Sequence, residues 1–342
     1  MTWLVTGGAG YIGAHIAAAL LDAGLDVVVL DDLSTGRGEF VPAGAAFVPG
    51  DVRNAETVRA ALVTHDVTGV IHAAGMKYAG VSVAEPLHAY GLNVGGTLSL
   101  LEAMADAGVE SLVFSSSCSV YGTPTVDAVD ETTPLAPESP YARSKLAAEW
   151  AIADAARART LAGGVLRHVS LRYFNVVGAG GSPGAVSAGV WDSSPHNLFP
   201  LVFEALREGR NPRINGDDYP TPDGTCIRDY IHVADIADAH VAAALALAAG
   251  PGGAADPLPA VINLGSGAGS SVREIMRAVA DVTGIAFEPE VAPRRAGDPA
   301  RIVAGAGLAG SALGWSARRG LREMVASGWA AHRGVSQGAE GR

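Results

Sequence analysis

The sequence Val5-Thr-Gly-Gly-Ala-Gly-Tyr-Ile-Gly13 carries the strongest indication of how this chain folds. It follows a short apolar run that starts at Trp3, and it leads into a segment with helical spacing of apolar residues. Gly7, Gly10 and Gly13 allow a tight turn, a close approach of the backbone to a pyrophosphate, and close packing of a helix on a strand. The N-terminus of such a helix offers free N–H groups to phosphate oxygens. The stretch therefore predicts a strand, a phosphate-binding loop and a helix.

Short apolar runs recur through the first half of the chain, with helix-like segments between them. Continuous apolar runs suit strands that are buried on both faces. Strands that alternate regularly with helices are typical of βαβ units in a parallel sheet. The further runs lie at 26–30, 46–48, 69–72 and 111–114. We therefore predict an α/β fold with a Rossmann-type, doubly wound parallel sheet.

Two aspartates close the second apolar run. Asp31 lies 18 residues after Gly13, at the place where a carboxylate binds the ribose hydroxyls of an adenosine. Asp31 and Asp32 have no adjacent arginine, which favours NAD over NADP as the cofactor. The alternative is a glycine turn followed by solvated acids, but the order of strand, loop, helix, strand and acid argues against it.

The pattern changes after about residue 175, where a Gly-, Ser- and Pro-rich stretch at 178–195 reads as a long loop. A helix at 233–249 and a strand at 261–264 then look sheet-like again. We therefore predict an NAD-binding Rossmann domain over 1–175, joined by about 230–264. The segments 176–229 and 265–330 would form a smaller, discontinuous substrate-binding lobe. The small, polar residues 331–342 are expected to be a frayed tail.

Composition narrows the class of protein. The 342 residues are 49% apolar, which suits about two domains or one domain with a lobe. Lys and Arg total 24 against 35 for Asp and Glu, a net charge of −11, so nucleic acid is not an expected partner. The longest apolar stretch, 241–249, is shorter than the about 20 residues that span a bilayer, so no membrane association is expected. A strand at the very start predicts that no signal peptide precedes the fold.

Cysteine usage indicates the compartment. Cys118 and Cys226 are the only cysteines, and they lie 108 residues apart. This pattern shows no disulfide framework and no metal-ligand spacing, and it fits a reducing cytoplasm. We interpret His72 and His232 as structural histidines and expect no metal site.

A tyrosine and a lysine mark the candidate catalytic helix. Pro140 fits the first turn of a helix, and Tyr141 and Lys145, four residues apart, share one face of it. A neighbouring ammonium group favours the phenolate and lowers the pKa of a tyrosine, so the pair is a plausible acid and base. Ser117 follows the strand at 111–114 and would orient a reacting sugar hydroxyl. The alternatives are an exposed helix face and a turn-forming serine.

These residues resemble the extended short-chain dehydrogenase/reductase superfamily and, within it, the UDP-glucose 4-epimerases. The resemblance covers residues 4 to about 325. The motif with the greatest specificity is Asp223-Gly-Thr-Cys-Ile-Arg-Asp-Tyr-Ile-His-Val233. The other matching stretches are 5–13, 50–53, 71–75, 114–117, 171–175 and 294–298.

The resemblance implies a role for each matching residue. Ser117, Tyr141 and Lys145 would be catalytic. The cofactor NAD would contact the glycine loop, Tyr11, Ile12, Asp31, Asp32, Leu33, Ser34, Thr35, Gly36, Asp51, Val52, Ala73, Ala74, Gly75, Lys77, Asn93, Ser115, Tyr141, Lys145, Tyr173 and Phe174. The UDP-hexose substrate would contact Lys77, Ser117, Tyr141, Asn175, Asn197, Leu198, Arg228, Arg295, Asp298 and Ile302. Without the family, Asp51 is as readily a helix cap, and Arg228 an ion-pair partner of Asp229.

The resemblance also implies a mechanism. Tyr141, assisted by Ser117, would take the proton of the sugar 4-hydroxyl, while the C4 hydride passes to NAD and returns to the other face of the 4-keto sugar. Lys145 would hold the nicotinamide ribose and lower the pKa of Tyr141. Because no net redox change occurs, NAD would stay bound. The family usually pairs through helices near 86–107 and 141–157, so a homodimer is expected by resemblance.

Several alternatives stay open. The stretch 186–196 departs from the family pattern, so Asn197 rests on the short match at 197–200. Ile302 stands at the size-selecting position and is of intermediate bulk, so a UDP-N-acetylhexosamine or UDP-uronate 4-epimerase is one alternative. A 4,6-dehydratase would need an acid and base pair where this chain has Cys118 and Ser119. A non-catalytic NAD-binding regulatory protein and a dehydrogenase that releases NADH are further alternatives.

Overall fold

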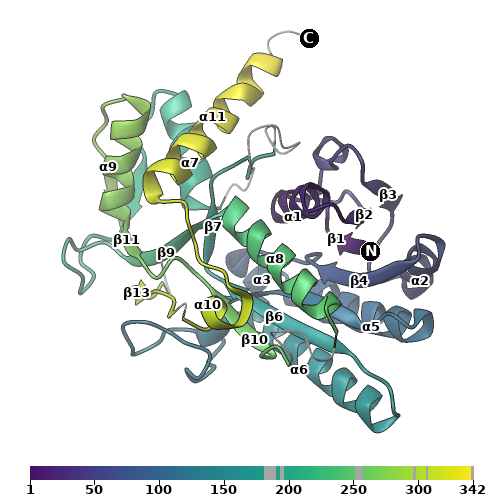
Figure 1. The fold of residues 1–342 in the computed structure, drawn as a ribbon. Helices are drawn as coiled ribbons and strands as arrows, with labels where there is room; N and C mark the ends of the chain where they lie inside the picture. Colours follow the sequence, from purple (N-terminus) through teal and green to yellow (C-terminus); the bar gives the residue numbers. More distant parts are fainter. Residues whose placement is uncertain (181–189, 193–195, 251–256, 296–297, 306, 340–342) are drawn as a thin grey trace.

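The computed structural model describes residues 1–180, 190–192, 196–250, 257–295, 298–305 and 307–339. The part of the predicted long loop at 181–189 and 193–195 therefore lies outside the described residues, as do 340–342 of the predicted tail. Two layers of helices enclose a central sheet, and a smaller lobe lies against one end of that sheet (Figure 1).

The central sheet has seven parallel strands in the order β10-β6-β5-β4-β1-β2-β3, which confirms the predicted Rossmann-type fold. Its strands are β1 (Thr2–Thr6), β2 (Asp26–Asp31), β3 (Ala46–Pro49), β4 (Val67–His72), β5 (Ser111–Ser117), β6 (Arg167–Tyr173) and β10 (Val261–Leu264). The inner strands are buried on both faces, as their continuous apolar runs predict. The strand order reverses beside β1, where such folds bind nucleotides.

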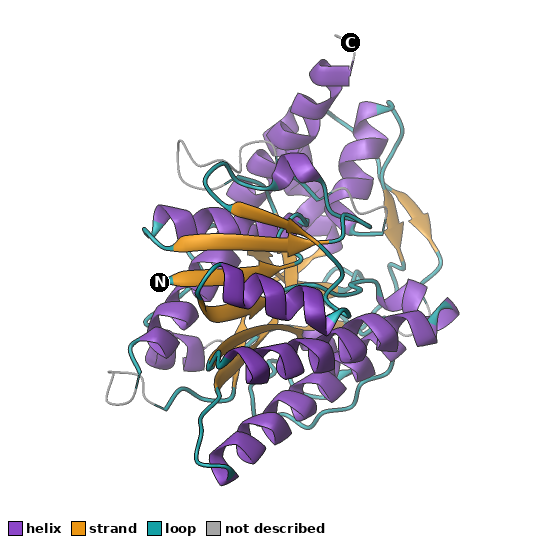
Figure 2. Cartoon of the chain, turned by 90° about the vertical axis from the view of Figure 1, so that its right-hand side faces the viewer, coloured by secondary structure: helices purple, strands orange, loops and turns teal. Residues whose placement is uncertain are grey.

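Helices cover both faces of this sheet (Figure 2). On one face α1 (Tyr11–Asp22) and α8 (Val233–Ala248) pack together on a core that includes Val5, Val29 and Ile236. The other face carries α2 (Ala55–Thr64), α5 (Gly96–Ala107) and α6 (Pro140–Leu161). The short elements between them are η1 (Gly38–Phe40), α3 (Ala79–Ala84), α4 (Pro86–Tyr90), η2 (Gly91–Gly95) and η3 (Cys118–Tyr121).

The smaller lobe has its own sheet and core. The strands β7 (Asn175–Val177), β9 (Ile227–His232), β11 (Gly269–Ser271) and β13 (Arg301–Ile302) form one sheet, and β8 (Arg213–Asn215) pairs with β12 (Glu290–Ala292). The lobe helices are α7 (Leu198–Arg207), α9 (Val272–Thr283) and α11 (Leu321–Ala339). Ser271 caps α9 through a capping box with Glu274, which fixes where that helix begins.

Three predicted boundaries differ from the structure. The segment 227–232 is β9 and pairs within the lobe sheet, so the chain returns to the Rossmann layer at α8. Helix α10 (Gly307–Leu313), predicted to lie in the lobe, instead buries Ala309 in the core under α8. Residues 331–339 continue α11 rather than fray, because Trp329 and His332 pack their rings on Phe203 of α7.

Candidate active site

A cleft of about 370 Å³ lies between the carboxyl ends of the central strands and the lobe. Tyr11 and Ile12 line its cofactor side, Ser117 and Tyr141 its centre, and Arg228 with Asp298 its lobe side. The predicted residues that also line it are Lys77, Tyr173, Phe174, Asn175, Asn197, Leu198 and Arg295. Elements far apart in the sequence therefore bring most of the predicted substrate residues into one cavity.

The glycine loop is built for a close backbone approach. Gly7 has a left-handed φ of 71°, and a Cβ there would lie 2.7 Å from the backbone of Ala74. A Cβ on Gly13 would lie 2.1 Å from the carbonyl oxygen of Gly7. Gly10 begins α1 without any side-chain cap, so the first N–H groups of the helix stay open to an anion. This cradle fits the pyrophosphate of a dinucleotide.

Asp31, at the end of β2, hydrogen bonds with the glycine loop and with the loop that follows β2. Its carboxylate accepts the N–H of Ala9 at 3.0 Å and the N–H of Leu33 at 2.8 Å. Burial raises the pKa of Asp31, and these two backbone hydrogen bonds oppose that shift. A Cβ on Gly36 would meet the Asp31 carboxylate at 2.8 Å, so the loop closes around the acid. The free lone pairs of this carboxylate suit the hydroxyls of a ribose.

Other predicted cofactor residues already have partners within the protein. The Asp51 carboxylate accepts hydrogen bonds from the backbone and guanidinium of Arg53, which lower its pKa. Asn93 accepts the N–H of Met76 at 2.8 Å and donates to the Ser144 hydroxyl at 2.8 Å. Asn93 therefore braces the loop after β4 against α6.

Tyr141 lies at the centre of the cleft. Ser139 caps α6 by accepting the N–H of Ala142 at 3.1 Å, and the Tyr141 N–H donates to Ser82 at 3.0 Å. Burial raises the pKa of Tyr141 to about 12, while hydrogen bonds with the Ser117 and Ser119 hydroxyls oppose the rise. In the protein alone, burial outweighs the opposing influences on this pKa, and the lowering expected from Lys145 stays a prediction.

Lys145 lies beneath the cleft rather than on its surface. Its ammonium donates to the carbonyl of Ser115 at 2.9 Å and lies 4.9 Å from the centre of the Phe114 ring. Burial lowers the pKa of Lys145 to about 8, and the charge of Glu149 opposes that shift. The ammonium also lies 3.7 Å from where a Cβ on Gly75 would stand. A small residue at Gly75 keeps this side of the lysine open to a ligand.

Ser117 has a partner that sequence reasoning missed. The hydroxyls of Ser117 and Ser119 lie 2.6 Å apart, and both act to lower the pKa of Tyr141. The sequence signal for this pair was the spacing of two residues in Ser117-Cys118-Ser119, because Ser117 caps η3 by accepting the N–H of Ser119. The missed residues that line the cleft include Cys118, Ser119, Asp192, His196, Arg213, Asn215, Cys226 and Tyr230.

The lobe side of the cleft holds an arginine and an acid. Arg228 pairs with Asp298, and not with its neighbour Asp229. Asp229 faces the other side of β9, where its carboxylate accepts hydrogen bonds from Ser266, Gly267 and Ala304. Ile302 does not line the cleft, because its side chain is buried with Val120 and Tyr121.

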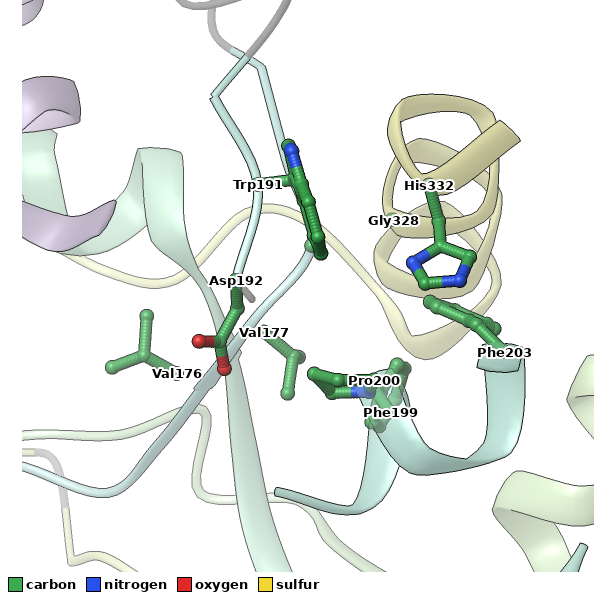
Figure 3. A pocket seen from close by; sticks show the side chains of 10 residues that line it. Val176, Val177, Trp191, Asp192, Phe199, Pro200, Phe203, Gly328 and His332 are labelled. Carbon is green, nitrogen blue, oxygen red and sulfur yellow. The ribbon is translucent and has the colours of Figure 1, made fainter. Parts of the chain in front are cut away.

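Asp192 lines the same cleft as Tyr11 and Ile12, and it joins two of the predicted substrate residues. The Asp192 carboxylate accepts from Lys77 at 3.2 Å and from Asn197 at 2.7 Å. Beside it lies a small aromatic pocket of about 20 Å³, room for one water molecule (Figure 3). Trp191 and His332 line this pocket and meet edge to face, with ring centres 5.5 Å apart. The small pocket is thus part of the packing that holds the 190–192 segment on α11.

The described residues contain neither a metal-binding cluster nor a membrane-spanning helix. No cluster of His, Cys, Asp and Glu in the described parts of the chain could hold a metal ion. Within the same residues, no helix is both long and apolar enough to cross a membrane.

A model of the NAD dependent epimerase/dehydratase family matches residues 3–265. The chain belongs to this family. A UDP-glucose 4-epimerase from Streptomyces lividans is 44% identical over 343 residues, covering 99% of this chain and 98% of that protein. One from Azospirillum brasilense is 44% identical over 313 residues, or 91% and 86% of the two chains. The family resemblance inferred from the motifs is therefore confirmed.

Solved structures of the family agree with this fold. A UDP-glucose-4-epimerase from Stenotrophomonas maltophila, with bound NAD and formylated UDP-arabinopyranose, has a TM-score of 0.90 at 38% identity, covering 99% of both chains. An epimerase from Bifidobacterium longum, in complex with NAD+ and UDP, has a TM-score of 0.85 at 34% identity and covers 99% and 100%.

Proposed function

We propose that this chain interconverts UDP-glucose and UDP-galactose with an NAD that it retains. The observation that carries the proposal is the meeting of Tyr141, Ser117 and Ser119 at the centre of one cleft, between a glycine loop and a cationic lobe. Its relatives named UDP-glucose 4-epimerase, at 44% identity over nearly the whole chain, support the same reaction.

The nucleotide would be held at both ends of the cleft. Arg228 and Arg295 offer planar guanidinium groups to the diphosphate, and Asp298 accepts from the uridine ribose. Asn197 and Lys77 lie at the opposite wall, where they also bind Asp192. Strong anchoring at the diphosphate leaves the sugar free to present either face of C4.

The proton steps fall to the Tyr141 hydroxyl. Its phenolate accepts the proton of the sugar 4-hydroxyl, and Ser117 hydrogen bonds with the same hydroxyl to orient it. NAD, when bound, supplies the hydride acceptor for C4, which leaves a 4-keto sugar. Burial raises the Tyr141 pKa. The lysine ammonium and the cationic ring of a bound NAD would both favour the phenolate and so oppose that rise. Return of the hydride to the other face of C4, and of the proton from Tyr141 to the oxygen at C4, would complete the epimerisation.

We propose that two copies pair through the α4–α5 and α6 surfaces. Leu87 and Leu98 expose 86% and 46% of their area on one of these surfaces, and Trp150 exposes 60% on the other. Large apolar side chains gathered in this way favour burial against a second copy.

The free thiols of Cys118 and Cys226 support a cytoplasmic location.

The direct test is incubation of the purified protein with UDP-galactose and no added cofactor. We expect UDP-glucose to form, with no free NADH in solution. UDP-N-acetylglucosamine and UDP-glucuronate serve as parallel substrates. Faster turnover of either one than of UDP-galactose would overturn the assignment of substrate, and bulk NADH would indicate a dehydrogenase.

A further inference from the structure

A buried carboxylate stands directly behind the catalytic residues. Glu149 lies on α6, one turn after Lys145 and two turns after Tyr141, and 7% of its area is exposed. It forms an ion pair with Arg172 of β6, whose Nε and Nη2 donate to the carboxylate at 2.9 and 2.6 Å. The Ser116 hydroxyl donates to the same carboxylate. A buried ion pair is weak support for stability, so its presence at this position calls for another role.

Glu149 holds the strand segment that carries the partners of both catalytic side chains. Ser116 lies between Ser115, whose carbonyl accepts from the Lys145 ammonium, and Ser117, which lines the cleft with Tyr141 and acts to lower the pKa of Tyr141. A shift at Ser116 would therefore move both of those partners at once. The network continues from Arg172 to the Tyr121 hydroxyl at 3.0 Å, which fixes the guanidinium in place.

Glu149 also supplies the negative charge nearest to the lysine among the groups that face it. From β4, His72 is hydrogen bonded to Thr6 and Thr97, and burial lowers the pKa of His72 to about 3, so it stays neutral. From β5, only the Phe114 ring and the Ser115 carbonyl face the ammonium.

Among the residues that the structure describes, the charge of Glu149 is the one that acts on Lys145, and the other neighbours are neutral or positive. Cys118 of η3, whose pKa burial raises to about 12, stays a neutral thiol beside Tyr141. Arg172 of β6 brings a positive charge, which Glu149 neutralises.

We propose that Glu149 is a positioning residue for the epimerase reaction: held by Arg172, it aligns Ser117 with Tyr141 and keeps Lys145 protonated. The inference rests on the proposed function, since it acts through the catalytic tyrosine and lysine. Without this charge, the buried ammonium would lose its proton at lower pH and would cease to favour the phenolate.

The test compares pH profiles of kcat in Glu149→Gln and Arg172→Met. In Glu149→Gln the lysine loses its counter-charge and faces an unpaired arginine, so the alkaline limb should move down by about one pH unit or more. In Arg172→Met the Glu149 carboxylate remains, so the alkaline limb of the kcat profile should stay at the same pH or move to higher pH. The double variant, which removes both charges, can fold where the single ones fail. In the double variant, the alkaline limb of the kcat profile should move to lower pH by less than in Glu149→Gln.

Controls separate this role from a general loss of folding. Glu56→Gln changes an exposed glutamate of α2 and should leave the profile unchanged. NAD content and the phenolate absorbance of Tyr141, measured against Tyr141→Phe in the same background, give readouts that do not need turnover. In Glu149→Gln the phenolate should form at higher pH.

A uniform loss of activity with an unshifted alkaline limb and phenolate titration would reduce Glu149 to a structural role and overturn the proposal. Failure of the wild-type protein to convert UDP-galactose would instead refute the proposed function.

Discussion

The tightest contact of the glycine loop predicts the outcome of one substitution. In Gly13→Ala the added Cβ would stand 2.1 Å from the Gly7 carbonyl oxygen, 2.8 Å from its carbon and 2.9 Å from the Gly8 Cα. All three atoms are backbone, so no side chain can move aside. The loop would have to open by about 1 Å, and overpacking of this kind costs about 1–3 kcal/mol.

Two assays measure this effect. Thermal unfolding should begin about 2–4 °C lower for each kcal/mol lost. The purified variant should also carry much less NAD than the wild-type protein, because the opened loop no longer places its N–H groups around a pyrophosphate.

A matched control is Gly38→Ala, where an added Cβ meets nothing within 4 Å. This variant should keep both its melting temperature and its NAD. If Gly13→Ala also retains wild-type NAD content and melting temperature, the close approach of residue 13 to Gly7 does not shape the cofactor site.

Three further outcomes are expected. Tyr141→Phe should lose most turnover, by about 10²–10⁴-fold for a general acid–base group, yet retain its NAD; wild-type rates would remove the role of the phenol. Asp229→Asn should lower the free energy of unfolding by about 1–3 kcal/mol in denaturant titrations, because the new amide N–H₂ would face the donors of Ser266, Gly267 and Ala304. An unchanged denaturation midpoint would contradict this. Burial lowers the pKa of His72 to about 3 and of His240 to about 4, from 6.5. Because only the unfolded chain binds these protons, the stability present above pH 6.5 should fall by several kcal/mol as the pH drops toward 4, and a flat profile would refute the buried neutral state.

Local patterns in the sequence were enough to predict the central sheet and the glycine loop. The continuous apolar runs correspond to β2, β4 and β5, and the run at 261–264 joins the same sheet as β10. Strand and helix periods are set by neighbouring residues, so a single sequence carries them.

Tertiary contacts decided what the sequence could not predict. The tail stays helical because Trp329 and His332 pack on Phe203, more than 120 residues earlier. Ile302 is the last residue of β13, and it packs inward on Val120 rather than into the cleft. The pKa of Tyr141 depends on burial by several elements, which the spacing of Tyr141 and Lys145 does not contain.

The fate of the hydrogen at C4 shows whether a hydride is held on a retained NAD or exchanged with water. UDP-galactose carrying deuterium at C4 is incubated in ordinary water with the purified protein and no added NAD, and the product is read by NMR and mass spectrometry. A hydride that passes to a retained NAD and returns leaves the deuterium at C4 of UDP-glucose. Loss of the deuterium to water, or conversion only when NAD is added, would contradict the transfer of the C4 hydride to a retained NAD.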